Sequence, residues 1–162
     1  MANAWAAKRG VGVLTLSSLR SDHYRLDPAV ERIRLELTWE STGLWRRMRS
    51  TLLRSGMIRR VVREFRPRAV VSFVDQTNVR ILAALIGTGV PVVACERVDP
   101  RRHRSGIGWR GARRLLYPRA AAVVVQTEPV AGWAKAFVPA RKVHVIPNFV
   151  RDLPQPTGAV ER

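Results

Sequence analysis

The chain has 162 residues, which suffice for one domain with a hydrophobic core and are too few for two domains of ordinary size. Hydrophobic residues make up 46% of it, a composition that excludes an intrinsically disordered protein. Its single cysteine, Cys95, excludes an internal disulfide and favours a reducing compartment. The N-terminus lacks the apolar core of a signal peptide, so we expect a cytoplasmic chain.

The net charge is +17, and its usual interpretations are a nucleic acid partner or an anionic membrane surface. Nearly all of the excess is arginine, which a GC-rich genome also produces, so charge alone selects no partner. The sequence has no helix-turn-helix, zinc-finger or RNA-binding signature. We therefore expect no specific nucleic acid partner, although a non-catalytic basic module that binds nucleic acid or an anionic membrane remains the alternative function.

Short β-branched segments alternate with helical ones, which predicts a Rossmann-like α/β fold, a mostly parallel sheet with helices on both faces. This domain covers residues 1–150, and residues 151–162, rich in proline and polar side chains, form a linker or tail. In chain order we expect the end of a helix over 1–8, strands over 11–16 and 32–37, a helix over 43–65, a strand over 69–74, a helix over 78–86, a strand over 91–94, a helix over 107–117, a strand over 122–125, a helix over 130–137 and a strand over 143–146.

The predicted helix over 43–65 is strongly basic, with seven arginines and one glutamate. Its apolar residues recur at helical spacing and indicate one apolar stripe: Leu44, Met48, Leu52, Ile58, Val62 and Phe65. One hypothesis is an interfacial helix on anionic lipid. The other is a helix that packs this stripe on the sheet and shows its arginines to water.

Acidic residues are scarce, and four of them follow the carboxyl ends of predicted parallel strands, where open α/β sheets bind ligands. Carboxylates and amides placed there can bind a hydroxyl-rich ligand, and arginines suit phosphate. Helix capping by Asp75, Thr77 or Thr127 is the competing explanation. The candidate residues are Asp75, Asn78, Glu96, Arg97, Asp99, Arg101, Arg102, Gln126, Thr127 and Glu128.

Several signatures of other chemistries are absent from the sequence. There is no Gly-x-Gly-x-x-Gly after a strand, no Walker loop and no Cys/His cluster with metal-ligand spacing. The three histidines lie far apart, with His103 a weak candidate for a general base or a phosphate contact and His144 within a strand pattern. We expect neither a metal nor a bound cofactor.

Five segments together resemble a branch of the family-4 glycosyltransferases. PVVACERVDPRR, residues 91–102, resembles a segment usually seen there as SERNDP, and RAVVSFVDQTN, residues 68–78, resembles the strand and loop before it. VVVQTE at 123–128 and HVIPNFV at 144–150 resemble a later strand and the crossover between domains, while DHYRLDPAVERIRL at 22–35 resembles the second and third strands. The order and spacing of these segments carry the resemblance.

The resemblance implies a GT-B enzyme with two Rossmann-like domains, of which this chain is the N-terminal, acceptor-side domain. Such enzymes retain the anomeric configuration without a metal and take a nucleotide sugar as donor, and the acceptor is often a polyprenyl-diphosphate-linked sugar of bacterial envelope pathways. Asp75 would be the catalytic residue, the other candidates would bind substrate, and Asn148 would lie at the hinge. An enzyme with a lipid-linked acceptor would lie on the inner face of the cytoplasmic membrane.

The chain also departs from the family pattern. The first strand with its Gly-rich loop, the donor domain and its Glu-x7-Glu signature are absent from the sequence, so we expect truncation at both ends, an inactive fragment and self-association through an exposed sheet edge. Cys95, Val98 and Phe149 replace the usual serine, asparagine and proline. Many relatives place a histidine where Asp75 stands.

Overall fold

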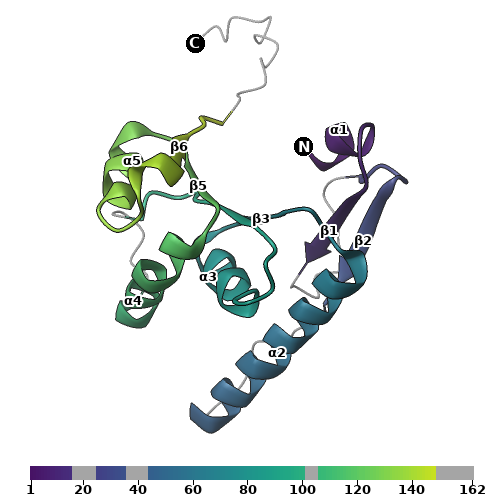
Figure 1. The fold of residues 1–162 in the computed structure, drawn as a ribbon, viewed down its shortest axis with the longest axis horizontal. Coiled ribbons are helices and arrows are strands. Elements are labelled where there is room, and N and C mark those ends of the chain that lie inside the picture. Colours follow the sequence, from purple (N-terminus) through teal and green to yellow (C-terminus); the bar gives the residue numbers. More distant parts are fainter. Residues whose placement is uncertain (16–24, 36–43, 101–105, 149–162) are drawn as a thin grey trace, which may run out of the picture. The chain divides into compact units, whose positions relative to one another are not determined.

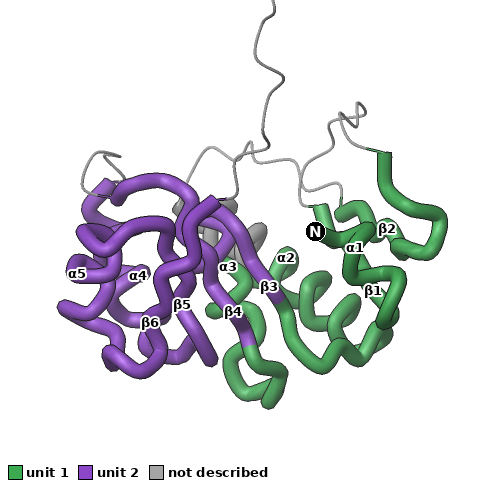
Figure 2. Tube along the Cα trace, turned by 90° about the horizontal axis from the view of Figure 1, so that it is seen from above, with its two compact units in different colours: residues 1–70, 80–91 green, residues 71–79, 92–162 purple. Residues whose placement is uncertain are grey.

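The computed structural model describes residues 1–15, 25–35, 44–100 and 106–148, and of residues 44–51 it describes the backbone alone. The described residues form helices and parallel strands, which alternate along the chain after the first two strands (Figure 1). They group into two compact units, unit 1 with residues 1–70 and 80–91 and unit 2 with residues 71–79 and 92–162 (Figure 2).

Unit 1 contains a two-stranded parallel sheet in which Val11 lies opposite Val30. The second strand begins two residues before the predicted start at Arg32, because a turn at Asp27 precedes it. In this turn, Oδ1 of Asp27 accepts a hydrogen bond from the N–H of Ala29 at 2.8 Å, and the carbonyl of Asp27 accepts one from the N–H of Val30 at 2.9 Å. Residues 36–37 lie outside the described residues. The elements are α1 (Ala2–Ala6), β1 (Val11–Thr15), β2 (Val30–Arg34) and α2 (Leu44–Phe65).

Helix α2 matches the predicted basic helix to within one residue. It ends where Arg66 turns into the left-handed region at φ +48°, followed by a proline that cannot continue the helix. The Arg59 guanidinium donates to the carbonyls of Ala84, the last residue of α3, and Ile86, the latter at 2.9 Å, and so ties α2 to the end of α3 and the residues after it. No helix of the described part has both the length and the apolar character needed to cross a membrane.

Unit 2 contains most of a four-stranded sheet in the order β3-β4-β5-β6, in which β4, β5 and β6 run parallel. Helices lie on both of its sides, which confirms the predicted Rossmann-like α/β fold (Figure 2). Val70 and the second half of α3 belong to unit 1. The elements are β3 (Val70–Phe73), α3 (Asp75–Ala84), β4 (Val92–Cys95), α4 (Ile107–Leu116), β5 (Ala122–Val125), α5 (Glu128–Lys135) and β6 (Val143–Val145), with 3-10 turns at Tyr117–Arg119 and Ala140–Lys142.

The described strands form a two-stranded sheet in unit 1 and a four-stranded sheet, most of which lies in unit 2. Within the described part, β1 pairs with β2 and no other strand, and β3 pairs with β4 and no other strand. β1 and β3 are therefore edge strands of their own sheets, and edge strands offer unpaired backbone groups to further pairing. Self-association through such an edge stays a prediction.

The core of unit 2 lies around the central strand β5, whose side chains Val123 and Val125 are fully buried. We expect Val123→Ala to lower the free energy of unfolding by about 2 kcal/mol, because it removes buried methyl groups and leaves a cavity. Val98→Ala makes the same chemical change at an exposed position and should change stability by less than about 0.5 kcal/mol. Urea unfolding of both variants measures the difference, and equal losses would contradict the placement of β5 in the core.

Candidate functional site

A sharp turn joins β3 to α3 and places Asp75 at the first position of the helix. Between them Val74 has φ +73°, a conformation that is strained for a β-branched residue. The turn explains why α3 begins three residues before the predicted start at Asn78, since the Asn78 N–H donates to the Val74 carbonyl at 2.8 Å as part of the first helical turn. Unusual backbone geometry of this kind is enriched at functional sites.

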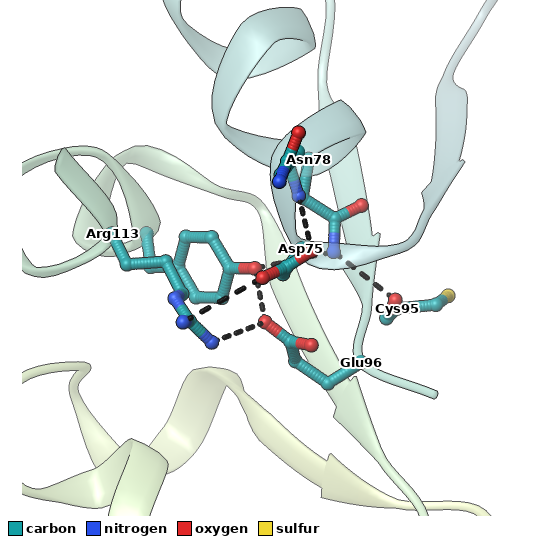
Figure 3. A network of polar contacts seen from close by, with 7 residues as sticks. Asp75, Asn78, Cys95, Glu96 and Arg113 are labelled. Carbon is teal, nitrogen blue, oxygen red and sulfur yellow. Dashed lines mark hydrogen bonds and ion pairs between the residues drawn. The ribbon is translucent and has the colours of Figure 1, made fainter. Parts of the chain in front are cut away.

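The buried guanidinium of Arg113, on α4, lies between two carboxylates (Figure 3). Its Nη2 is 3.7 Å from Oδ2 of Asp75, and its Nη1 is 3.5 Å from Oε1 of Glu96. The guanidinium also lies over the ring of Trp133 on α5, with Cζ 5.4 Å from the ring centroid. The end of β3, the end of β4 and two helices thus converge on one charged side chain.

Glu96 and Asn78 belong to the same buried network (Figure 3). The phenol of Tyr117 links them. The Tyr117 hydroxyl donates to Oε1 of Glu96, and Asn78 Nδ2 donates to that hydroxyl oxygen at 3.2 Å and to the Cys95 carbonyl at 3.1 Å. Asn78 is fully enclosed and Glu96 nearly so. In the described structure these two candidate residues therefore lie inside unit 2, where their hydrogen bonds stabilise the edge of the sheet.

The buried network shifts the proton affinity of two of its members. Burial raises the pKa of Glu96 above its ordinary value of 4.5, and the neighbouring Asp75 charge adds to this, while the Tyr117 hydrogen bond and the Arg113 charge oppose it. Burial and the adjacent Glu96 raise the pKa of the Tyr117 phenol. Tyr117 therefore stays protonated and acts as the hydrogen-bond donor to Glu96.

A second contact at the same end of unit 2 involves Arg97, directly after β4. Its guanidinium lies over the Phe73 ring, 5.1 Å from the centroid, and donates to Oδ1 of Asn148. Arg97 therefore joins the end of β3 to the segment after β6. This contact connects a predicted substrate-binding residue with the predicted hinge residue.

The remaining candidate residues differ in exposure. Thr127 is the N-cap of α5, but its side chain makes no capping hydrogen bond, so capping does not explain it. The structure leaves Thr127, Glu128 and Asn148 exposed and Asp99 and Gln126 partly exposed, and Gln126 Nε2 is buried without a hydrogen-bond partner among the described residues. Arg101, Arg102 and His103 lie outside the described residues, and His144 is exposed on β6.

Sequence reasoning missed Arg113 and Tyr117, which complete the network. Arg113 stands among exposed arginines of α4, and only burial separates it from neighbours such as Arg114. Tyr117 is the last residue of the helix predicted over 107–117, and in the structure it begins the 3-10 turn after α4. Within the described part, no group of three or more histidine, cysteine or acidic side chains is arranged to hold a metal ion.

Comparison with known proteins gives the family. A model described as "Glycosyl transferase 4-like domain" matches residues 1–148, so the chain belongs to the glycosyl transferase 4-like family. A similar protein is the GalNAc-alpha-(1->4)-GalNAc-alpha-(1->3)-diNAcBac-PP-undecaprenol alpha-1,4-N-acetyl-D-galactosaminyltransferase of Campylobacter jejuni subsp. jejuni serotype O:2, with 27% identity over 118 residues. The match covers 73% of this chain and 32% of that enzyme, so the chain spans about a third of the relative's length.

Among solved structures, the UDP-N-acetylglucosamine 2-epimerase from Rickettsia bellii has a similar fold, with a TM-score of 0.54. The sequence identity is 17%, and the match covers 69% of this chain and 29% of the epimerase. At this identity the likeness concerns the fold alone. It agrees with the α/β architecture described above.

We expect Arg113→Met to lower the free energy of unfolding by about 3–5 kcal/mol, because it leaves the buried Glu96 and the partly exposed Asp75 without their cation. Arg114→Met is the matched control, since Arg114 is the exposed neighbour on α4 and should cost less than about 0.5 kcal/mol. Chemical denaturation of the two variants and the wild type measures both values. Similar losses for both variants would contradict a central role of Arg113.

The raised pKa of Glu96 predicts a pH-dependent stability. A group whose pKa is higher in the folded state favours folding fully below its unfolded value, here 4.5, and this contribution is lost as pH rises through the folded pKa. The glutamine of Glu96→Gln stays neutral at every pH. As the pH rises from below 4.5 to neutral, the free energy of unfolding of the variant should therefore increase relative to that of the wild type. Urea unfolding across this range measures the difference, and a difference independent of pH would refute the prediction.

Proposed function

We propose that the chain is the acceptor-side part of a retaining glycosyltransferase, which transfers a sugar from a nucleotide sugar to a lipid-linked or polysaccharide acceptor. The family match over residues 1–148 supports glycosyl transfer. The name of the Campylobacter relative states a polyprenyl-diphosphate-linked sugar as its acceptor, which supports a lipid-linked acceptor here. Because the chain spans 32% of that relative's length, the proposal assigns the complete reaction to this domain together with a second, donor-binding domain.

The observation that carries the proposal is the position of Asp75. Its carboxylate follows the carboxyl end of β3, is partly exposed and is held by the buried Arg113 at 3.7 Å. A carboxylate fixed in this way can accept the proton of an acceptor hydroxyl while the hydroxyl oxygen attacks the anomeric carbon of the donor. The bond from that carbon to the nucleoside diphosphate breaks, and the nucleoside diphosphate leaves.

The other candidate residues divide by their surroundings. Asn78 and Glu96, being buried, would shape the acceptor site from beneath. The basic side chains would bind the diphosphate of the acceptor, and the exposed or partly exposed polar groups after β4 and β5 would bind sugar hydroxyls. In this scheme the side chains that bind the diphosphate are Arg97, Arg101 and Arg102. The groups that bind sugar hydroxyls are Asp99, Gln126, Thr127 and Glu128, and Asn148 is the hinge.

We further propose that the isolated 162-residue chain has no transferase activity. In this proposal the nucleotide sugar is bound mainly by a second domain, and neither a metal nor another cofactor takes part. Incubation of the purified chain with nucleotide sugars and a polyprenyl-diphosphate acceptor tests this. Release of nucleoside diphosphate above the background rate would refute inactivity.

The cellular location follows from the proposed acceptor. A polyprenyl-linked sugar is anchored in the membrane, so the chain would work in the cytoplasm, bound peripherally to the inner face of the cytoplasmic membrane. The net charge of +17 supports attraction to anionic lipid.

We expect Asp75→Asn to weaken binding of a polyprenyl-diphosphate-linked sugar about 10- to 100-fold, because a hydrogen bond to a charged group contributes about 1.5–3 kcal/mol. Isothermal titration calorimetry with a short-chain polyprenyl analogue measures the affinity. Glu31→Gln, at an exposed position on β2, is the control and should bind as the wild type does. Unchanged binding by Asp75→Asn would remove Asp75 from the proposed site.

A further inference from the structure

Two arginines near the ends of β3 and β4 differ in how their charge is compensated. Arg113 is buried, and the carboxylates of Asp75 and Glu96 lie 3.7 Å and 3.5 Å from its guanidinium. Arg97 is half-buried, and no carboxylate of the described residues lies within ion-pair distance of it. The fold therefore neutralises Arg113 and leaves the charge of Arg97 for a ligand.

Two uncharged side chains hold the guanidinium of Arg97. It lies over the ring of Phe73, the last residue of β3, with Cζ 5.1 Å from the ring centroid. Its Nη1 donates to Oδ1 of Asn148, which follows β6. The ring contact uses one face of the planar guanidinium, so the N–H groups at Nε and Nη2 can still donate in the plane to an anion.

Neutral partners fix the position of a cation without cancelling its charge. Because the guanidinium is ordered before a ligand arrives, binding costs less side-chain entropy than it would for a freely moving arginine. Its planar fork matches the oxygen atoms of a phosphate group. A phosphate group also carries more negative charge than a carboxylate, so an uncompensated cation attracts it more strongly.

We propose that Phe73 and Asn148 are positioning residues that hold Arg97 for the phosphate groups of a ligand. The inference deepens the proposed function and rests on it for the identity of that ligand, the diphosphate-linked acceptor. It gives Phe73, which the sequence did not single out, a part in the site. It also gives Asn148 a task in ligand binding in addition to the proposed hinge.

The test uses inorganic pyrophosphate, which supplies the phosphate groups without sugar or lipid. NMR titration of the purified chain at physiological salt measures the dissociation constant. Arg97→Gln should weaken binding about 10- to 100-fold, because a hydrogen bond between two charged groups is lost. The matched control is Arg141→Gln, which removes an exposed arginine of the 3-10 turn before β6 and should bind as the wild type does.

The variant Asn148→Asp separates charge from structure. It keeps the oxygen that accepts from Arg97 but makes this oxygen part of an anion, so the guanidinium stays in place and its charge is compensated. Pyrophosphate affinity should fall about 10-fold, while stability in urea should not decrease. Asn3→Asp makes the same change at an exposed residue of unit 1 and should leave the affinity unchanged.

Two further variants test the ring of Phe73. Phe73→Leu keeps an apolar side chain at the end of β3 but offers no π face, so the affinity should fall about three- to fivefold. Phe73→Tyr keeps the ring and should bind as the wild type does. Circular dichroism of each variant checks that it is folded.

Several outcomes would overturn the proposal. They are failure of the wild type to bind pyrophosphate, and unchanged binding by Arg97→Gln, Asn148→Asp or Phe73→Leu. Tighter binding of glucuronate than of pyrophosphate would also overturn it, because the subsite would then prefer a carboxylate. Binding of the polyprenyl-diphosphate-linked sugar and its dependence on Asp75 are measured separately. A failure of the proposed function there is distinguishable from a failure of the phosphate subsite.

Discussion

The arrangement of unit 2 depends on the burial of the Arg113 guanidinium. A buried cation is stable only with compensating anions, and here Asp75 and Glu96 supply them at 3.7 Å and 3.5 Å. The two carboxylates come from the ends of neighbouring strands, β3 and β4, and the cation comes from α4. Each charge thus fixes the element that carries it, and the ends of the two strands and the helix are held in one geometry.

The support extends beyond the ion pairs through groups that stay neutral. The Tyr117 phenol, whose pKa is raised, keeps its proton and donates it in a hydrogen bond to Glu96, and Asn78 donates to the Tyr117 oxygen. Because the network lies in a poorly solvated region, each of these bonds is stronger than it would be in water, and each missing partner would cost more. The side chains around Asp75 are therefore restricted to one arrangement before any ligand is present.

Much of this organisation could be predicted from the sequence, and the parts that could not have identifiable causes. The alternation of β-branched segments and helices predicted the fold, and the rule that ligands meet strand ends singled out Asp75 and Glu96. Arg113 was missed because a buried arginine has the same sequence signal as its exposed neighbours. The start of α3 was misplaced because the turn depends on a left-handed Val74, a conformation that propensity disfavours for valine. Spacing alone also assigned Leu52, which is 71% exposed in the structure, to the packed side of α2, since a helical repeat shows periodicity and not which side meets the sheet.

The candidate site therefore has a buried part and an accessible part with different tasks. Asn78, Glu96, Arg113 and Tyr117 are enclosed and can act on a ligand only by holding their neighbours. Asp75 stands between the two parts: one oxygen faces the buried guanidinium, and its side chain is still partly exposed. In the proposed reaction the Asp75 carboxylate gains from such support, because its orientation must be fixed to within a small angle. The strained turn at Val74 serves the same end, since it brings the carboxylate onto the first turn of a helix directly at the end of a buried strand.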